Sequence, residues 1–320
     1  MRTRPAALAV ALGALALALF PAALHAWTPG THIYLGESIL ANLHALPAAV
    51  ADLLRAFPFD FLYGNIAADS SIAKKYAPVG RHCHHWHVGQ EIHDRAMSDA
   101  LRAFGLGYLS HLAADVVAHH HFVPRQLLLT SSTSGFGHSY WESRFERPLG
   151  PDFSRTAKEV ILLDHTPADA HLDQIIAPTI FSVRTNRRLF RGMVHLTETD
   201  GWHRAFEVAE RRSRWELAVP DVERHLALSF EYIMGMLESP DCAARRFDPS
   251  GEEPLRKAKW WRREVLLAGG WRDAARLHDR AEEAFGLPDT ALPHWRAATL
   301  KRPWLQPPPA EASPAEGTSA

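Results

Sequence analysis

The segment from Gly107 to Phe122 (GYLSHLAADVVAHHHF) constrains the fold most, because it places ionisable side chains inside an apolar run. His111 and Asp115 stand four residues apart, and three consecutive histidines follow from His119. Residues i and i+4 share one face of an α-helix, so the pair can aim an imidazole and a carboxylate at one point. Buried groups of this kind need polar partners. We therefore expect a buried helix whose polar face is completed by other segments.

A second segment, GFGHSYWESRFE, repeats the four-residue spacing with His138 and Glu142. Two such pairs facing each other would form a metal-binding core between helices. Either pair alone is more often a hydrogen-bonded core pair than a metal site, so spacing leaves both interpretations open. The chain has 20 histidines and only two cysteines. Any metal would therefore have nitrogen and oxygen ligands, which suits zinc and does not suit a thiolate zinc finger.

The rest of the chain has a helical pattern, with apolar residues recurring at intervals of three and four. No segment shows sustained alternation of apolar and polar residues, and 47% of the 320 residues are hydrophobic. The sequence thus predicts an all-α fold without a β domain, as a single multi-helix domain over residues 27–300. Helices are expected at 31–54, from within 82–93 to 104, from 107 to Pro124, and at 140–145, 157–163, 172–190, 202–218, 222–237 and 253–285. A loop is expected at 57–71.

The first 26 residues have the pattern of a secretory signal peptide, with Arg2 and Arg4 before an apolar core. An uncleaved membrane anchor is the alternative. Cleavage after Ala26 would leave Trp27 as the first residue, and the protein would be exported, either periplasmic or secreted. Residues 301–320 are rich in Pro, Ala and Ser and predict a disordered tail. Export would permit a disulfide between Cys83 and Cys242, but free thiols are equally consistent with their spacing.

Several of these residues, taken in order, resemble the motifs of the zinc-dependent phospholipase C family. This α-helical trinuclear-zinc fold is shared with single-strand nucleases of fungi and plants and with the catalytic domain of glycosylphosphatidylinositol-specific phospholipase D. The matching residues are Trp27 at the expected cut, His32 five positions on, Asp69 in YGNIAADSS, His85 in HHW, His111 with Asp115, and His138 with Glu142. The resemblance covers roughly residues 27–146.

The resemblance implies three zinc ions. Asp69, His85, His111 and Asp115 would hold the first ion. The amino nitrogen and carbonyl oxygen of Trp27, with His32 and the other oxygen of Asp115, would hold the second ion. His138, Glu142 and one further histidine would hold the third. That histidine is His119 or His121; on a helix His119 lies about 40° from Asp115 and His121 about 120° away, so His119 is preferred.

The resemblance also implies the function, an exported phospholipase C-type hydrolase that cleaves a phospholipid phosphodiester, with zinc as cofactor and Asp69 as the residue that orients or deprotonates the attacking water. The substrate would be a phospholipid or membrane surface, and no protein partner is implied. One alternative is a single-strand nuclease of the same fold, for which nucleic acid would be the substrate. Another is a zinc-binding protein without turnover.

Two further features bear on the substrate without deciding it. The aromatic residues between Phe57 and Tyr63 would form either a substrate wall or a packed loop. The basic run from Arg184 to Arg191 would either attract an anionic membrane or nucleic acid, or form a solvated helix face. A formal net charge of -1 shows no overall basic balance that would announce a nucleic-acid binder.

Overall fold

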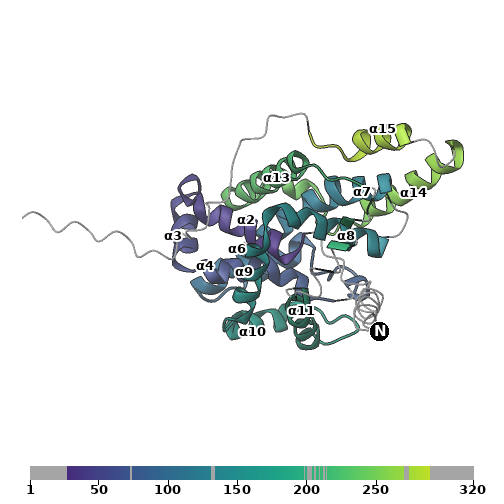
Figure 1. The fold of residues 1–320 in the computed structure, drawn as a ribbon. Helices are drawn as coiled ribbons and strands as arrows, with labels where there is room; N and C mark the ends of the chain where they lie inside the picture. Colours follow the sequence, from purple (N-terminus) through teal and green to yellow (C-terminus); the bar gives the residue numbers. More distant parts are fainter. Residues whose placement is uncertain are drawn as a thin grey trace, which may run out of the picture.

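The computed structural model describes residues 27–288, apart from 73, 131–133, 198, 200–203, 205–206, 209, 212, 214 and 270–273. Over the described part of the chain every regular element is helical and none is a strand, which confirms the predicted all-α class. Helix α6 (Asp99–Val117) runs through the middle of the molecule, and helices α4 (Pro58–Ala67), α5 (Trp86–Asp94) and α13 (Val219–Glu238) pack against it (Figure 1).

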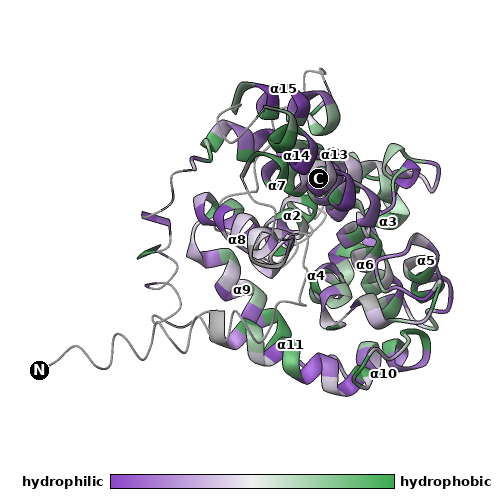
Figure 2. Ribbon diagram, turned by 90° about the vertical axis from the view of Figure 1, so that its right-hand side faces the viewer, coloured by the Kyte–Doolittle hydropathy of each residue, from purple (hydrophilic) through white to green (hydrophobic). Residues whose placement is uncertain are grey.

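The other helices surround this centre. They are α2 (Pro29–Ala41), α3 (Ala48–Ala56), α7 (Val123–Thr130), α8 (Ser134–Glu146), α9 (Pro151–Leu162), α10 (Thr166–Ile175), α11 (Val183–Thr197), α14 (Glu252–Gly269) and α15 (Ala274–Phe285). Short 3-10 turns are η1 (Leu43–Ala45), η2 (Ala68–Ser70), η3 (Lys74–Tyr76), η5 (Arg147–Leu149) and η6 (Ala243–Arg246). Figure 2 shows hydrophilic and hydrophobic residues alternating along the peripheral helices α10 and α11, as expected of helices with one buried side.

Helices α4 and α6 cross with their backbones in contact, at Gly64 and Gly107. A Cβ atom on Gly64 would overlap the Phe104 carbonyl, and one on Gly107 would overlap the Phe61 carbonyl. Only glycine permits so close an approach. The crossing brings the end of α4, and the turn η2 that follows it, against the side of α6 that carries the ionisable residues.

Helix α6 continues into α7 through a single π-helical turn, η4 (Ala118–Phe122), which contains the three histidines. A π-turn inserts one extra residue and rotates the side chains that follow it, and such turns are frequent at functional sites. Pro124 was predicted to end the central helix; instead it lies in the first turn of α7, where proline is tolerated.

The expected loop at 57–71 is wrong, because these residues form α4 and the turn η2. Pro58 begins the helix at a position where its missing N–H costs no hydrogen bond. Phe61 and Tyr63 are fully buried, and Phe57 and Phe59 pack against the core. The hypothesis of an aromatic substrate wall therefore gives way to core packing.

Four expected helices are divided. The helix expected at 31–54 is split between α2 and α3, and that expected at 253–285 between α14 and α15. The expected helix reaching residue 104 is broken after α5, and α6 begins anew at Asp99, where the Ser98 side chain accepts a hydrogen bond from the Leu101 amide at 3.3 Å. Because α6 begins at Asp99, Gly107, the expected start of the central helix, lies inside it. The expected helix at 172–190 is split between α10 and α11. Of the expected helix at 202–218, residues 202, 203, 205, 206, 209, 212 and 214 lie outside the described residues, and residues 215–218 are not helical.

The buried apolar residues form one cluster that extends from Trp27 to Phe285. Helices from both halves of the sequence thus share a core. The expected signal segment 1–26 and tail 301–320 lie outside the described residues. Among the helices that the structure describes, none has both the length and the apolar character needed to span a bilayer.

Candidate metal centre

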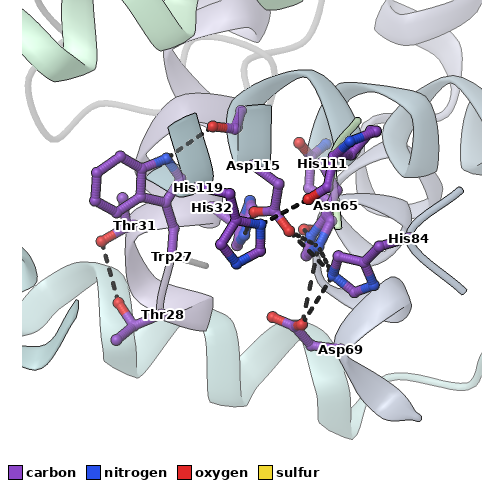
Figure 3. A network of polar contacts seen from close by, with 12 residues as sticks. Trp27, Thr28, Thr31, His32, Asn65, Asp69, His84, His111, Asp115 and His119 are labelled. Atoms are coloured by element: carbon purple, nitrogen blue, oxygen red, sulfur yellow. Dashed lines mark hydrogen bonds and ion pairs between the residues drawn. The ribbon is translucent and has the colours of Figure 1, made fainter. Parts of the chain in front are cut away.

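Asp115 is the residue around which the buried polar groups gather, and its two carboxylate oxygens face different imidazoles (Figure 3). Oδ1 lies 3.2 Å from His32 Nε2. Oδ2 lies 3.0 Å from His84 Nε2 and 3.2 Å from His111 Nε2. None of these four side chains is more than 1% exposed. The carboxylate therefore stands between two sets of nitrogen atoms, as a ligand bridging two cations would.

Asp115 Oδ2 and three atoms around it have the spacing of a zinc coordination shell. The Nε2 atoms of His84 and His111 are 3.1 Å apart, and Asp69 Oδ1 lies 3.4 Å from the first and 3.9 Å from the second. Tetrahedral zinc with bonds of 2.0–2.2 Å holds its ligand atoms about 3.4 Å apart. We call Asp69, His84, His111 and Asp115 the first cluster. Its donor set of imidazoles and carboxylates fits zinc.

Buried polar atoms without hydrogen bonds indicate that a metal ion also fits between His32 and Asp115. Neither ring nitrogen of His32 and neither oxygen of Asp115 makes a hydrogen bond within the described residues, although all four atoms are buried. The His32 ring stacks on His111 with centroids 3.8 Å apart. Buried polar atoms without hydrogen bonds are rare and call for an explanation such as an ion. A cation between His32 Nε2 and Asp115 Oδ1 would satisfy two of them.

Neighbouring groups fix the orientation of two imidazoles in the first cluster. His111 Nδ1 lies 2.7 Å from the Asn65 carbonyl and donates its N–H to it, which leaves the Nε2 lone pair facing Asp115. His84 Nδ1 lies 3.2 Å from Cys83 Sγ, so the Nε2 of this ring also faces the cluster. Metal-binding histidines are commonly held in this way through the second ring nitrogen.

His84, and not the predicted His85, lies in the first cluster. His84 is 1% exposed, whereas His85 is half-buried and packs its ring near His82 and His87. Both residues precede α5 in an irregular segment, where adjacent side chains point in different directions. The family motif in HHW could be aligned to either histidine, and the fold of this segment decides between them.

Trp27 lies beside this cluster. Its indole is fully buried, stacks on Phe145 at 3.9 Å between ring centroids, and donates a hydrogen bond to the Ala114 carbonyl at 3.0 Å. Ala114 immediately precedes Asp115, and His32 follows in the first turns of α2. Trp27 is thus anchored next to the two residues with which the sequence grouped it.

A second cluster, made of His119, His138 and Glu142, lies farther along the same helices. His138 Nε2 is 2.7 Å from Glu142 Oε1, which places the pair one turn apart on α8. The His119 ring meets the His138 ring edge to face at 5.5 Å between centroids. All three side chains are buried. His121 donates from Nδ1 to the Gly286 carbonyl at 3.1 Å, so the structure places His119, not His121, beside His138.

A loop from the C-terminal part of the chain holds His119 in place. His119 Nδ1 lies 2.6 Å from the Pro249 carbonyl, to which it donates, and His120 Nε2 lies 2.7 Å from the Asp248 carbonyl. Gly251 has φ of +63°, and a Cβ there would meet His119 Cγ at 2.7 Å. Sequence reasoning missed this loop, because its contribution comes from backbone carbonyls that any residue carries.

Burial acts differently on the ionisable groups of the two clusters. Burial and Lys74 would lower the pKa of His84, but Cys83, Asp115 and Asp69 raise it well above its usual range. Burial, reinforced by His111, lowers the pKa of His32 to about 4, and burial lowers the pKa of His119 to about 3 against the pull of Asp115. Burial alone would raise the pKa of Asp115, but His111, His32 and His84 hold it well below its usual range. At neutral pH His32 and His119 therefore keep their lone pairs and Asp115 its charge, as metal binding requires, whereas a metal would have to displace a proton from His84.

Lys74 is a further charged residue of the first cluster that sequence reasoning missed. Its ammonium lies 2.7 Å from Asp69 Oδ1 and 3.2 Å from His84 Nε2, and the side chain is only 7% exposed. A lysine in a polar segment such as SSIAKKY is ordinarily solvated, so the sequence carries no signal for this placement.

Fold and geometry together define an all-α protein with a buried centre of imidazoles and carboxylates suited to zinc. Residues 31–176 match the family model described as zinc dependent phospholipase C. This segment contains both clusters, and its match confirms the resemblance to the zinc-dependent phospholipase C family seen in the sequence. A search of curated proteins and a search of solved structures each find no match to this chain.

Proposed function

We propose that this protein is an exported zinc-dependent phospholipase C that hydrolyses the phosphodiester of a phospholipid. The observation that carries the proposal is the shell of four ligand atoms that includes Asp115 Oδ2, 3.0–3.9 Å apart in the measured pairs, within the matched segment. The family is one of hydrolases, and it implies a phospholipid substrate.

Three zinc ions are proposed, as the family pattern implies. Asp69, His84, His111 and Asp115 would hold one. His32, the other oxygen of Asp115 and the backbone of a terminal Trp27 would hold the next, and the second cluster would hold the last. When bound, zinc lowers the pKa of a water and neutralises phosphoryl oxygens.

The chain's own residues then set the geometry. Asp115 would keep the two zinc positions on either side of it at a fixed separation, since each oxygen faces its own imidazoles. The Asn65 carbonyl would hold the His111 tautomer. Asp69, at the start of the loop that reaches the centre, is the proposed residue that orients the attacking water or takes its proton.

Exposed apolar side chains near this centre support a lipid substrate. They lie on two loops that are joined by a hydrogen bond from Thr179 Oγ1 to the Ile72 carbonyl at 2.7 Å. Tyr76 and Val79 are 56% and 104% exposed on one loop, and Ile180 is 58% exposed on the other. Apolar groups beside a catalytic centre suit contact with a bilayer interface.

Two observations weigh against the nuclease alternative. Arg187 and Arg191 pair with Asp169, at 3.1 and 3.0 Å, and Arg184 pairs with Asp173 at 3.0 Å. Much of the basic run is therefore neutralised within the protein. Of the aromatic rings before Asp69, Phe61 and Tyr63 are buried and Phe57 and Phe59 pack against the core, which leaves little surface on which bases could stack.

One assay tests the proposal. The protein beginning at Trp27 is loaded with zinc and incubated with vesicles of phosphatidylcholine, vesicles of phosphatidylinositol, and single-stranded DNA and RNA. We expect diacylglycerol and a phosphorylated head group. Release of nucleotides without diacylglycerol would contradict the phospholipase proposal and support the nuclease alternative. Tightly bound zinc without any product would indicate a non-catalytic zinc-binding protein. N-terminal sequencing of the exported protein tests whether Trp27 is its first residue.

A further inference from the structure

Lys74 occupies an unusual position, because it is a cation placed where the proposed zinc would have its ligands. Its ammonium lies 2.7 Å from Asp69 Oδ1 and 3.2 Å from His84 Nε2. Both atoms belong to the shell of four described above. The lysine comes from turn η3, five residues after Asp69, and is nearly as buried as the ligands themselves.

The ammonium and a zinc ion need the same electron pairs. His84 Nε2 lies within hydrogen-bond distance of Lys74 and of Asp115 Oδ2, and zinc can bind it only through its lone pair. That lone pair can accept an N–H of Lys74 or bind a metal, but it cannot do both. Asp69 Oδ1 is shared in the same way. In this structure the Lys74 ammonium therefore takes up the contacts with Asp69 and His84 that a zinc ion would use.

Charge balance gives the lysine a role when metal is absent. Asp69 and Asp115 are both fully buried, and an uncompensated buried carboxylate is strongly destabilising. Lys74 is the ammonium that pairs directly with Asp69, and His32, His84 and His111 surround Asp115. The lysine thus compensates part of the negative charge that zinc would otherwise balance.

We propose that Lys74 is a resident cation of the first cluster, which holds the metal-free site together and which zinc must displace from Asp69 and His84. Lys74 then sets how much free zinc is needed to load the site. The proposal rests on the proposed function, because it takes the first cluster as a zinc site. It adds a competitor that lowers zinc affinity and supports the unloaded fold.

The test compares the wild-type chain with Lys74→Met and Lys74→Gln, using zinc alone as the probe. Zinc dissociation constants are measured by competition with a fluorescent chelator, and thermal unfolding is followed with and without zinc. We expect both variants to bind their tightest zinc at least about tenfold more strongly, since two charge-assisted hydrogen bonds no longer compete. Their metal-free forms should unfold at a lower temperature than wild type, while the loaded forms differ less.

Lys257→Met is the matched control, because it removes the same charge from an exposed pair with Glu253 at 2.6 Å on α14, a helix that carries no residue of the first cluster. Its zinc affinity should equal that of wild type. If the Lys74 variants do not fold without zinc, they are refolded with zinc and the rate of zinc release to excess chelator is measured; slower release supports the proposal. Unchanged or weaker zinc binding by both variants would overturn it. Wild-type protein that takes up no zinc would instead remove the proposed function, and this inference with it.

Discussion

The two clusters are built differently. The first cluster draws its side chains from η2, the segment before α5 and helix α6, and the backbone crossing at Gly64 and Gly107 holds these elements together. The second cluster joins a π-turn to α8, and its His119 is oriented by the loop at Pro249 and Gly251. That loop lies outside the matched residues 31–176. The orientation of His119, which lies within the matched segment, thus depends on a loop outside that segment.

The largest expected effect comes from Asp115, which serves two proposed zinc positions. Asp115→Asn should abolish zinc binding at the first cluster and lower activity roughly 1,000-fold or more, because metal chemistry contributes several kcal/mol. Glu142→Gln should remove only the ion of the second cluster. Zinc is counted per protein by elemental analysis. Equal zinc loss in the two variants would mean that the clusters are one cooperative site rather than two.

The next effect separates His84 from His85. His84→Ala should weaken zinc binding at the first cluster by about 100-fold, since it removes one of four ligand atoms. His85→Ala is the matched control and should bind zinc like wild type. Both affinities come from chelator competition. The opposite result would restore His85 as the ligand and show that the segment before α5 rearranges around the metal.

An acid titration compares the clusters without changing a residue. The folded-state pKa of His32 is about 4 and that of His119 about 3, both below the ordinary 6.5. Between pH 6.5 and the folded-state pKa of each histidine, the unfolded chain binds more protons than the folded chain. The stability of the metal-free protein is therefore fully present above pH 6.5 and is lost as pH falls toward 4 for His32 and toward 3 for His119. His32 should account for on the order of 3 kcal/mol of this loss.

Urea unfolding of the metal-free protein at pH 7, 5.5 and 4.5 measures how its free energy of unfolding changes with pH. In His32→Asn the loss of stability between pH 6.5 and 4 should diminish, whereas in His119→Asn it should diminish over the wider range from pH 6.5 to 3. A metal-free protein whose stability is flat from pH 7 to 4.5 would contradict the burial of neutral histidines at both clusters.

The smallest effect tests the loop behind the second cluster. Gly251→Ala should lower the zinc affinity of that cluster by about tenfold, because the new Cβ meets His119. Gly150→Ala is the control: Gly150 also has positive φ, at +88°, but nothing lies within 4 Å of its Cβ position. Both variants carry similar backbone strain. Equal zinc affinities would show that the loop does not position His119.

The sequence predicted those features that depend on local spacing. The all-α class, the buried helix with His111 and Asp115, and the pairing of His138 with Glu142 follow from residues four apart on one helix. The choice of His84 over His85 did not follow, because it depends on irregular backbone before α5. Lys74 and the Pro249 carbonyl could not be predicted either, since their contacts are set by packing between distant elements. The aromatic run at 57–63 was misassigned because an amphipathic aromatic pattern can belong to a loop or to a short buried helix.

The glycine crossing between α4 and α6 has a consequence for how this protein can vary. Peptide groups, not side chains, set the spacing of these two helices, and peptide groups are the same in every sequence. Core residues elsewhere can be exchanged, enlarged or shortened while the turn carrying Asp69 keeps its distance from His111. The two glycines thus fix the distance between α4 and α6, so the residues of the metal centre can keep their positions when side chains elsewhere in the core are replaced.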